Sequence, residues 1–349
     1  MPRPFKKSRP VRKRTWDSND WDTVSREGRS RRADSASGPV RSSGEYFSDC
    51  DANGIVVSPY GVLAFVLCAD AECLCRVDTS LVDGKTSILA PGDMVRVESG
   101  EKGPVVCAVR PRTNKLSRPS VGRDREQVFA ANIDRAVIVA SVARPAFNPG
   151  LIDRYLVAAQ AGGVEPIVCV NKIDISGAEP GGIAMYRELG LAVVTTSCES
   201  GAGLAALREL LIAKTSVLVG HSGTGKSSLV NALDPDLTIH TQEISESSKK
   251  GRHTTSASRL YELAGAIRII DTPGIKQLGL WGVSTAEINY YFREIAEFSQ
   301  QCKFRDCTHT HEPTCAVRDA VETGAIARGR FESYLRIRAS LEEEAKSGE

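Results

Sequence analysis

The pattern of hydrophobic and polar positions divides the chain into four regions. Residues 1–47 are rich in Arg, Ser, Asp and Gly and show no apolar periodicity, which is typical of a disordered segment. Short apolar runs separated by turn residues fill 48–119, and apolar runs alternate with helical patterns over 120–284. A helical pattern around a group of cysteines occupies 285–349. We therefore expect a leader followed by three folded domains with these boundaries.

The second region predicts a small β-barrel. Its five apolar runs lie at 54–58, 61–68, 72–78, 93–99 and 104–110, and turn sequences at 82–85 and 90–93 separate some of them. Five short strands without a convincing helix favour a closed barrel. An OB-fold, a fold that commonly binds oligonucleotides, is the natural candidate. A barrel that serves only as a spacer is the alternative, and 111–119 is interpreted as a basic linker.

The third region predicts an α/β domain. Strands are expected at 135–142, 165–172, 192–197, 215–220 and 266–272, with helices at 151–162, 204–211 and 226–233. This alternation favours a mainly parallel sheet covered by helices. In the last region we expect one helix over 284–300, capped by Ser284, and two more over 313–345, broken at Gly324 and Gly329.

Composition places the chain among ordinary globular proteins. It has 349 residues, of which 41% are hydrophobic and 25% charged. We find no window of about 18 apolar residues that would span a membrane. The N-terminus lacks the apolar stretch of a secretory signal, and its early acidic residues disfavour a transit peptide. We expect a cytoplasmic protein, monomeric and without a membrane partner.

Charge is distributed unevenly around the net value of +2. Residues 1–47 hold 12 Lys/Arg and 6 Asp/Glu, whereas the remainder holds 33 basic and 37 acidic residues. A basic arm on a mildly acidic body suggests contact with a polyanion, most plausibly RNA. A solvated leader that aids solubility is an equally good interpretation.

One glycine-rich segment follows a predicted strand and opens a predicted helix. It matches the phosphate-loop pattern G-x-x-x-x-G-K-[ST]. Its residues, with the adjoining serine, are Gly220, His221, Ser222, Gly223, Thr224, Gly225, Lys226, Ser227 and Ser228. In such a loop backbone N–H groups surround the phosphates, Lys226 supplies a point charge, and Ser227 supplies an oxygen to Mg²⁺. The start of the following helix adds a favourable dipole.

A second motif, Asn171-Lys172-Ile173-Asp174, follows the strand at 165–170. An Asp carboxylate can accept hydrogen bonds from both N1–H and the exocyclic amine of guanine. Adenine does not offer this pair of donors, so the motif favours GTP over ATP. Its position after a strand agrees with the binding of ligands at the carboxyl ends of α/β sheets.

Three further segments complete the expected site. Asp271, in Asp-Thr-Pro-Gly, is placed to hold Mg²⁺ through water, and the N–H of Gly274 could sense the γ-phosphate. A threonine of the 251–255 segment, which we assign as Thr254, would complete the magnesium shell. The backbone of Ser197 and Cys198 could contact the guanine O6.

These elements occur in an unusual order. A Ras-like chain runs from phosphate loop to D-x-x-G and then to N-K-x-D, whereas here the base-reading motif comes first. A circular permutation explains this order without a change of fold, because domain termini often lie close together. The segment that senses the γ-phosphate is then joined directly to the C-terminal domain.

The C-terminal cysteines predict a structural metal site. Three cysteines and one histidine form a closed tetrahedral set suited to Zn²⁺. The expected ligands are Cys302, Cys307, His309 and Cys315, and by spacing alone His311 could replace His309. No open coordination position is implied, so we expect no zinc catalysis.

Together these motifs and their order resemble the RsgA/YjeQ family of circularly permuted GTPases that depend on the small ribosomal subunit. The resemblance covers about 50–335. It implies an OB-fold, a permuted GTPase core and a zinc domain, and it favours His309 over His311. It also implies that the chain binds the 30S subunit late in maturation, with GTP hydrolysis stimulated by that subunit. The basic leader is not part of the usual pattern.

The residue after D-x-x-G sets an expectation for hydrolysis. Ras-like enzymes position the attacking water with a glutamine at this position, but this chain has Ile275. We therefore expect low intrinsic turnover, and His253 is our candidate for holding the water, because a neutral imidazole can polarise it. His253 could instead contact rRNA or pack in the switch.

Two other functions compete with a regulatory GTPase. An RNA-binding module could retain a vestigial nucleotide site, although the intact Lys226, Ser227, Asp271 and Asp174 argue against this. A P-loop ATPase or kinase would require the base-reading motif at 171–174 to be accidental. Hydrolysis measured with and without 30S subunits distinguishes the first alternative, and the relative affinity for ATP and GTP distinguishes the second.

Overall fold

The structure is a computed structural model that describes residues 47–69, 71–83, 86–119, 126–235, 237, 258–272 and 279–346. The expected disorder of the leader therefore lies almost entirely outside the described residues. Within the described segments, no helix combines the length and hydropathy that a membrane crossing requires.

The expected barrel is confirmed. Its strands are β1 (Gly54–Tyr60), β2 (Leu63–Cys68), β3 (Ala71–Val77), β6 (Met94–Gly100) and β7 (Gly103–Val109). They close in the order β1-β2-β3-β7-β6, with β3 and β7 parallel and the other pairs antiparallel. Inward-facing side chains such as Val56, Val66, Val95 and Val106 are fully buried and fill the barrel. A 3₁₀-helix, η2 (Thr79–Leu81), and a short pair, β4 (Val82–Asp83) and β5 (Thr86–Ser87), follow β3.

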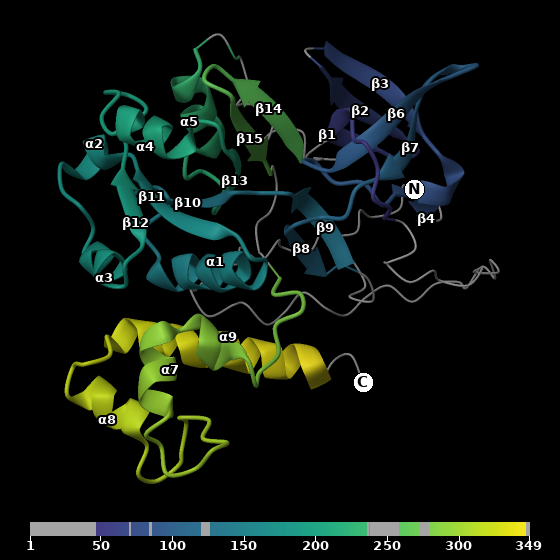
Figure 1. Ribbon diagram of the computed structural model, residues 1–349. Coiled ribbons are helices and arrows are strands. Elements are labelled where there is room, and N and C mark those ends of the chain that lie inside the picture. Colours follow the sequence, from purple (N-terminus) through teal and green to yellow (C-terminus); the bar gives the residue numbers. More distant parts are fainter. Residues whose placement is uncertain are drawn as a thin grey trace, which may run out of the picture. The chain divides into compact units, whose positions relative to one another are not determined.

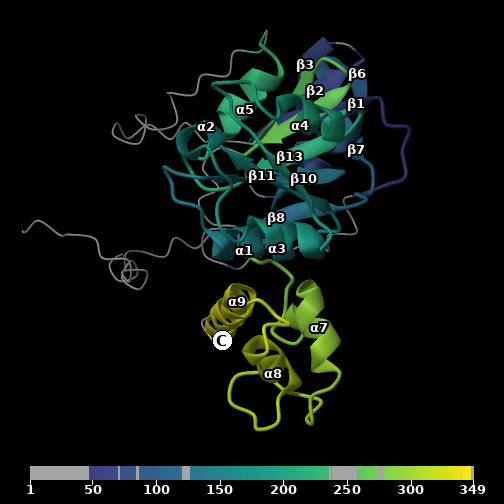
Figure 2. The same cartoon turned by 90° about the vertical axis from the view of Figure 1, so that its left-hand side faces the viewer.

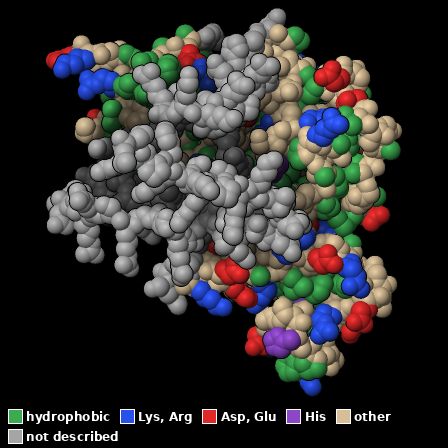
Figure 3. Space-filling view, turned by 180° about the vertical axis from the view of Figure 1, so that it is seen from behind, with side chains coloured by type: hydrophobic (Ala, Val, Ile, Leu, Met, Phe, Trp, Pro, Cys, Tyr) green, Lys and Arg blue, Asp and Glu red, His purple; other side chains and the backbone are tan. Residues whose placement is uncertain are grey.

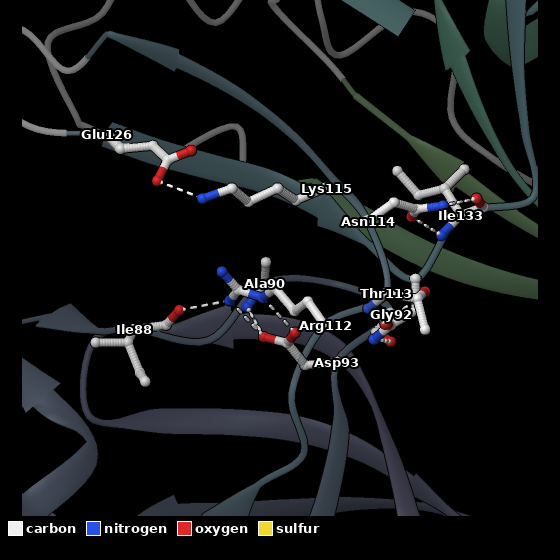
Figure 4. Close-up of polar contacts among 11 residues, drawn as sticks. Ile88, Ala90, Gly92, Asp93, Arg112, Thr113, Asn114, Lys115, Glu126 and Ile133 are labelled. Atoms are coloured by element: carbon white, nitrogen blue, oxygen red, sulfur yellow. Dashed lines mark hydrogen bonds and ion pairs between the residues drawn. The ribbon is translucent and has the colours of Figure 1, made fainter. Parts of the chain in front are cut away.

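The segment after the barrel is more ordered than a linker. Part of it, β8 (Lys115–Pro119), pairs antiparallel with β9 (Glu126–Ala131), so the interpretation of 111–119 as a linker is wrong for its second half. The strand was missed because Leu116 is its only buried side chain. Upstream, the buried carboxylate of Asp93 accepts two hydrogen bonds from Arg112 at 2.7 Å (Figure 4). Asn114 likewise exchanges two hydrogen bonds with the backbone of Ile133.

The central domain is a six-stranded sheet in the order β12-β11-β10-β13-β15-β14 (Figure 1). The strands are β10 (Arg135–Ser141), β11 (Glu165–Asn171), β12 (Ala192–Thr195), β13 (Thr215–Val219), β14 (Arg259–Leu263) and β15 (Ile267–Asp271). All neighbouring pairs are parallel except β14 with β15. The expected α/β sheet is confirmed, whereas β14 was not predicted.

Helices cover both faces of this sheet. Alternate residues of β10, such as Ile138 and Val139, belong to two different core clusters, as expected for a strand buried on both sides. The first cluster includes residues of α1 (Pro149–Ala161) and α3 (Ile183–Glu188). The second includes residues of α4 (Leu204–Leu211) and α5 (Lys226–Leu233). A single helical turn, α2 (Ile173–Ser176), follows β11.

The C-terminal domain is helical (Figure 2). It contains η4 (Ile288–Tyr291), α7 (Arg293–Ser299), α8 (Ala316–Glu322) and α9 (Arg328–Lys346), and α9 packs against α1. The helix expected over 284–300 is thus split into a 3₁₀ turn and α7. The predicted break at Gly329 is wrong, because this residue lies inside α9; burial of Tyr334, Ile337 and Leu341 outweighs the low helix propensity of glycine.

Candidate functional site

Several loops with polar residues meet at one edge of the central sheet. The phosphate-loop segment follows β13, the base-reading motif follows β11, and Asp271 is the last residue of β15. Because these strands are parallel, their carboxyl ends lie at the same edge, which is where α/β sheets bind ligands.

The glycines of the phosphate loop meet specific backbone demands. Gly220, Gly223 and Gly225 have φ values of 148°, 81° and 95°, which L side chains rarely adopt. A Cβ at Gly220 would lie 2.3 Å from the carbonyl oxygen of Val139, and one at Gly225 would lie 2.4 Å from Nδ2 of Asn171. The loop is therefore packed closely against both β10 and the base-reading motif.

Lys226 points back over the loop that precedes it. Its Nζ donates to the carbonyl oxygens of Gly220 at 2.9 Å and His221 at 3.1 Å. Burial lowers the pKa of Lys226, and the nearby carboxylate of Asp271 opposes this effect. The ammonium group is thus held inside the curve of the loop, where a phosphate-loop lysine meets its anion.

Ser227 and Asp271 form a candidate cation site. Ser227 Oγ donates to Asp271 Oδ2 at 3.3 Å, and only 4% of the Asp271 surface is exposed. Burial raises the pKa of Asp271, while Lys226 and the hydrogen bond from Ser227 lower it. Its Oδ1 is buried without a hydrogen-bond partner among the described residues. A hydroxyl and an unpartnered carboxylate oxygen are hard oxygen donors that fit hydrated Mg²⁺.

Two residues of the base-reading motif donate hydrogen bonds to the phosphate loop. Asn171 is buried, and its Nδ2 donates to the carbonyl oxygen of Thr224 at 3.1 Å. Lys172 adopts a left-handed conformation, with φ of 64°, and its Nζ donates to the carbonyl oxygens of Arg144 and Gly223, both at 2.6 Å. These contacts tie the loops after β10, β11 and β13 together.

Asp174 is oriented by a different loop. Ser197 Oγ, which is fully buried, donates to Asp174 Oδ1 at 2.6 Å and accepts a hydrogen bond from the backbone N–H of Ser200 at 3.1 Å. The hydroxyl of Thr196 donates to Asn171 Oδ1 at 3.1 Å, and Cys198 Sγ approaches the same oxygen at 3.7 Å. The loop after β12 therefore holds the side chains of Asn171 and Asp174 in place.

The structure brings together most, but not all, of the residues assigned from sequence. The loops around 171–174, 197–198 and 220–228 and Asp271 share one edge, and His221 is exposed there, with Nδ1 2.8 Å from the carbonyl oxygen of Ser222. His253, Thr254 and Gly274 lie outside the described residues, as does Ile275. Their roles stay predictions.

Two contributors to this site were not predicted from the sequence. The carbonyl oxygen of Arg144 anchors Lys172, although nothing in the local sequence marks that backbone position. Tyr155, on α1, lines a cavity of about 120 Å³ together with His221 and Thr224 of the phosphate loop. Tyr155 follows the apolar period of its helix, so the pattern alone assigns it to the core.

A second cluster lies in the C-terminal domain. The ligand atoms of Cys302, Cys307, His309 and Cys315 all lie within 4.8 Å of one another. His309 Nδ1 lies 3.6 Å from Cys302 Sγ and 3.3 Å from Cys315 Sγ, and the two sulfurs are 3.9 Å apart. Sulfurs bound tetrahedrally to Zn²⁺ would be separated by about 3.8 Å. The cluster can therefore hold a metal, and His311 is exposed and outside it.

Glu312 shapes the loop between two members of this cluster. Its carboxylate accepts hydrogen bonds from the backbone N–H groups of Thr308, Thr310 and His311 at 2.6, 3.0 and 3.2 Å. These donors and the Thr308 hydroxyl lower the pKa of Glu312 well below its usual range, against the effect of burial. The loop is thus held in a conformation that presents His309 to the three thiols.

The chain is similar to proteins of one known family. The sequence profile described as RsgA GTPase matches residues 109–281. Two curated relatives named small ribosomal subunit biogenesis GTPase RsgA are similar to most of the chain. The protein of Actinobacillus succinogenes is 41% identical over 306 residues, covering 84% of this chain and 86% of the relative. That of Yersinia enterocolitica is 40% identical over 301 residues, covering 83% and 85%.

Solved structures agree with the fold. The crystal structure of YjeQ from Thermotoga maritima has a TM-score of 0.65 and 30% identity, covering 83% of this chain and 98% of that one. The structure of YloQ, described as a circularly permuted GTPase, has a TM-score of 0.62 and 27% identity, covering 87% and 99%. The permuted order inferred from the sequence is confirmed by this likeness.

Proposed function

The chain belongs to the RsgA GTPase family, and from this membership we propose that it hydrolyses GTP to GDP and phosphate while acting in late maturation of the small ribosomal subunit. The observation that carries the proposal is the meeting of Asp174, Lys226 and Asp271 at one edge of the sheet. These are the base-reading, phosphate-binding and magnesium-binding groups of a GTPase, and they occur in the permuted order.

Guanine recognition rests on Asp174 and its support. The carboxylate, oriented by Ser197, accepts hydrogen bonds from N1–H and the exocyclic amine of the base. With adenine, the Asp174 carboxylate would face the ring nitrogen N1, which is an acceptor and has no proton to donate. The carboxylate would stay unpaired, and the free-energy cost of this unpaired group favours guanine over adenine. Asn171 and Lys172 act by holding the phosphate loop next to the base-binding loop. Ile173 and the backbone at Cys198 border the same site.

Phosphate binding rests on the loop at 220–228. Its backbone N–H groups and the start of α5 face the anion, and Lys226 turns from the loop carbonyls towards the β and γ phosphates. Ser227 and Asp271, with Thr254, would hold Mg²⁺, which neutralises phosphate charge when bound. Gly274 would sense the γ-phosphate through its N–H. The Asp271 oxygen without a partner supports this assignment.

Hydrolysis needs a residue that positions water. Because Ile275 cannot do so, intrinsic turnover should be low, and His253 is the residue proposed to hold the attacking water. The ribosomal subunit would then supply what the nucleotide site lacks and stimulate turnover. Replacing His253 by Ala should abolish stimulated turnover and leave nucleotide affinity unchanged; stimulated turnover that persists in this variant would exclude the catalytic role.

The partners and the compartment follow from the same membership. The relatives are named for small-subunit biogenesis, which supports the 30S subunit and its rRNA as partners of a cytoplasmic, monomeric protein. Lys/Arg and Asp/Glu side chains are interspersed over the described part of the surface seen from behind (Figure 3). The excess of positive charge lies instead in residues 1–47, the segment best suited to contact RNA.

The Cys302–Cys315 cluster is proposed to hold one structural Zn²⁺.

One experiment tests the proposal against its main competitor. Initial rates of GTP hydrolysis are measured with the purified full-length protein, with and without purified 30S subunits, and Lys226→Ala provides a matched inactive control. Turnover that increases with 30S subunits in the wild type alone is the expected result. An RNA-binding module with a vestigial site would bind the subunits but show no turnover above that of Lys226→Ala under either condition.

A further inference from the structure

We propose that helix α1 connects the C-terminal domain to the phosphate loop, so that docking of this domain through Arg330 controls how tightly nucleotide is held. The proposal rests on the nucleotide site described above and concerns its regulation. The covalent connection between the two domains runs through the segment after β15, whereas the route proposed here is a side-chain route through Asp153 and Tyr155.

The first half of the route is a buried ionic group. Arg330, on α9, donates to Asp153 Oδ1 at 2.7 Å and to Glu294 Oε1 at 2.6 Å. Its guanidinium also lies over the ring of Phe292, 4.3 Å from the centroid. Asp153 is fully buried, and Arg330 is 4% exposed. Arginine and aspartate are almost never buried to this degree unless they are paired, so the group specifies how α9 docks on α1.

This ionic group is incompletely satisfied. Tyr186 also donates to Asp153 Oδ1, at 2.9 Å, but Asp153 Oδ2 and Glu294 Oε2 are buried without a partner among the residues that the structure describes. Two carboxylates thus share a single guanidinium. A buried network of this kind binds one partner specifically but does not gain the full stability of complete pairing. It is therefore suited to a contact that is released when the C-terminal domain binds elsewhere.

The second half of the route lies on the other face of α1. Tyr155 follows Asp153 by two residues, which places its side chain about 200° around the helix. It is 1% exposed, and its hydroxyl has no hydrogen-bond partner within the described chain. The side chain lines a cavity together with His221, the residue after Gly220, and burial raises the pKa of Tyr155 to about 12.

The space between α1 and the phosphate loop allows adjustment. The cavity of about 120 Å³ lies there, lined by Tyr155 and by His221 and Thr224 of the loop. Because a void leaves its lining atoms without contacts on one side, a small shift of α1 can change how it supports the loop. Docking through Arg330 holds α1 in place, and undocking removes this restraint.

The direction of the effect follows. With the C-terminal domain docked, Tyr155 supports the loop beside His221 and Thr224, and the loop keeps its phosphate-binding conformation. When Arg330 no longer binds the carboxylates of Asp153 and Glu294, the phosphate loop becomes more mobile and nucleotide dissociates faster. A coupling of ordinary size between two sites corresponds to a change of at least 5-fold.

The test measures nucleotide release without ribosomes. The dissociation rate of fluorescently labelled GDP is followed by stopped flow for the full-length wild type, Arg330→Met and Arg293→Met. Arg293 belongs to the same domain but is 81% exposed and pairs only with Glu297 among the described residues, so its replacement should leave the rate unchanged. Arg330→Met should release GDP at least 5-fold faster, with faster hydrogen exchange at 220–227.

A double-mutant cycle identifies the route. If the effect passes through Tyr155, then Tyr155→Leu, which removes the ring that lines the cavity, also accelerates release. Adding Arg330→Met to it then accelerates release less than the product of the two single effects. Asp153→Asn serves as a second variant if Arg330→Met loses its metal or its cooperative melting transition. A wild-type release rate in a folded variant, or strictly multiplicative effects in the cycle, would overturn the proposal. Because this assay contains no ribosome, its result is independent of whether 30S subunits stimulate hydrolysis.

Discussion

The side-chain amide of Asn289 lies 3.5 Å from Nε2 of His309, on the side of the imidazole away from the thiols. Nδ1 of the same ring faces Cys302 and Cys315. A metal on Nδ1 requires the imidazole proton to lie on Nε2. Asn289 must then present its side-chain oxygen to that proton, because the orientation of an amide is assigned from its hydrogen-bond partners. As the structure places the amide, the Tyr334 hydroxyl donates to Asn289 Oδ1 at 2.7 Å. With the amide turned so that its oxygen faces His309, the same hydroxyl accepts from Nδ2 instead.

From this contact we predict that Asn289→Leu accelerates release of the bound metal by about 10–100-fold, the usual effect of losing a partner that orients a histidine ligand. Zinc loaded into the purified wild type and variants is released to a chromogenic chelator to measure the rate, and the helical circular dichroism of the variant shows that the fold is retained. Tyr290→Leu is the matched control, because Tyr290 is the next residue and is 78% exposed. Equal rates in the wild type and Asn289→Leu would show that Asn289 does not orient the ligand.

The hydrogen bond from Ser197 to Asp174 predicts an effect on base selectivity. Without the hydroxyl, the carboxylate loses a charged hydrogen bond worth about 1.5–3 kcal/mol, so GTP affinity should fall by about 10–150-fold in Ser197→Ala. ATP affinity should change little, because adenine does not use this carboxylate. Competition against a labelled nucleotide measures both affinities. Ser176→Ala, at an exposed serine of α2, is the control, and an equal loss for both nucleotides would contradict base-specific orientation.

The raised pKa of Asp271 predicts a pH dependence. Because burial favours the protonated form, this carboxyl takes up its proton at a higher pH than an ordinary aspartate. In the absence of metal its ionisation makes folding less favourable as pH rises through this window. Acidification should therefore weaken magnesium-dependent nucleotide binding before ordinary carboxylates titrate. The affinity for labelled GDP, measured against pH with Mg²⁺ or with EDTA, checks this.

Asp271→Asn separates this titration from other acid effects. The variant should bind GDP with little dependence on Mg²⁺ and without the acid transition that requires Mg²⁺. An acid transition of the same size in the variant would assign the effect to another group.

The strands and loops that carry the candidate site were predicted more completely than the contacts that support them. A phosphate loop is formed by residues that are consecutive in the sequence. The motif at 220–227 and its flanking strand and helix could therefore be predicted from the sequence. The closed barrel was predictable for the same reason, because its apolar runs and turns are local signals. The identity of His309 as the histidine in the cluster followed from the family resemblance and agrees with its burial.

Contacts between distant residues could not be predicted in this way. Arg330 and Asp153 are 177 residues apart, and a charged residue in a helical pattern is normally assigned to the solvent face. Likewise β14 has a short, mixed apolar pattern and is stabilised by antiparallel pairing with β15. Such features depend on which surfaces meet after folding, and a single sequence carries no periodic signal for them.

The buried pair of Asp93 and Arg112 gives the last prediction. Asp93 is fully buried and Arg112 is 11% exposed in its side chain, and the same carboxylate accepts a hydrogen bond from the backbone of Ala90 at 2.8 Å. Arg112 also donates to the carbonyl oxygen of Ile88 at 2.9 Å and lies over the ring of Phe47. As Figure 4 shows, one guanidinium thus joins the end of the barrel to the segment before β8.

Replacing Arg112 by Met should leave Asp93 as a buried, unpaired charge and lower the free energy of unfolding by about 3–5 kcal/mol. Chemical denaturation followed by tryptophan fluorescence measures this change, and limited proteolysis should show new cleavage near residue 112. Arg96→Met is the control, because Arg96 is 41% exposed and its pairing with Glu98 is correspondingly weak. The double variant Asp93→Asn/Arg112→Met should recover part of the loss, since it removes the unpaired charge. A double variant less stable than Arg112→Met would mean that Arg112 acts through packing on Phe47 rather than through its charge.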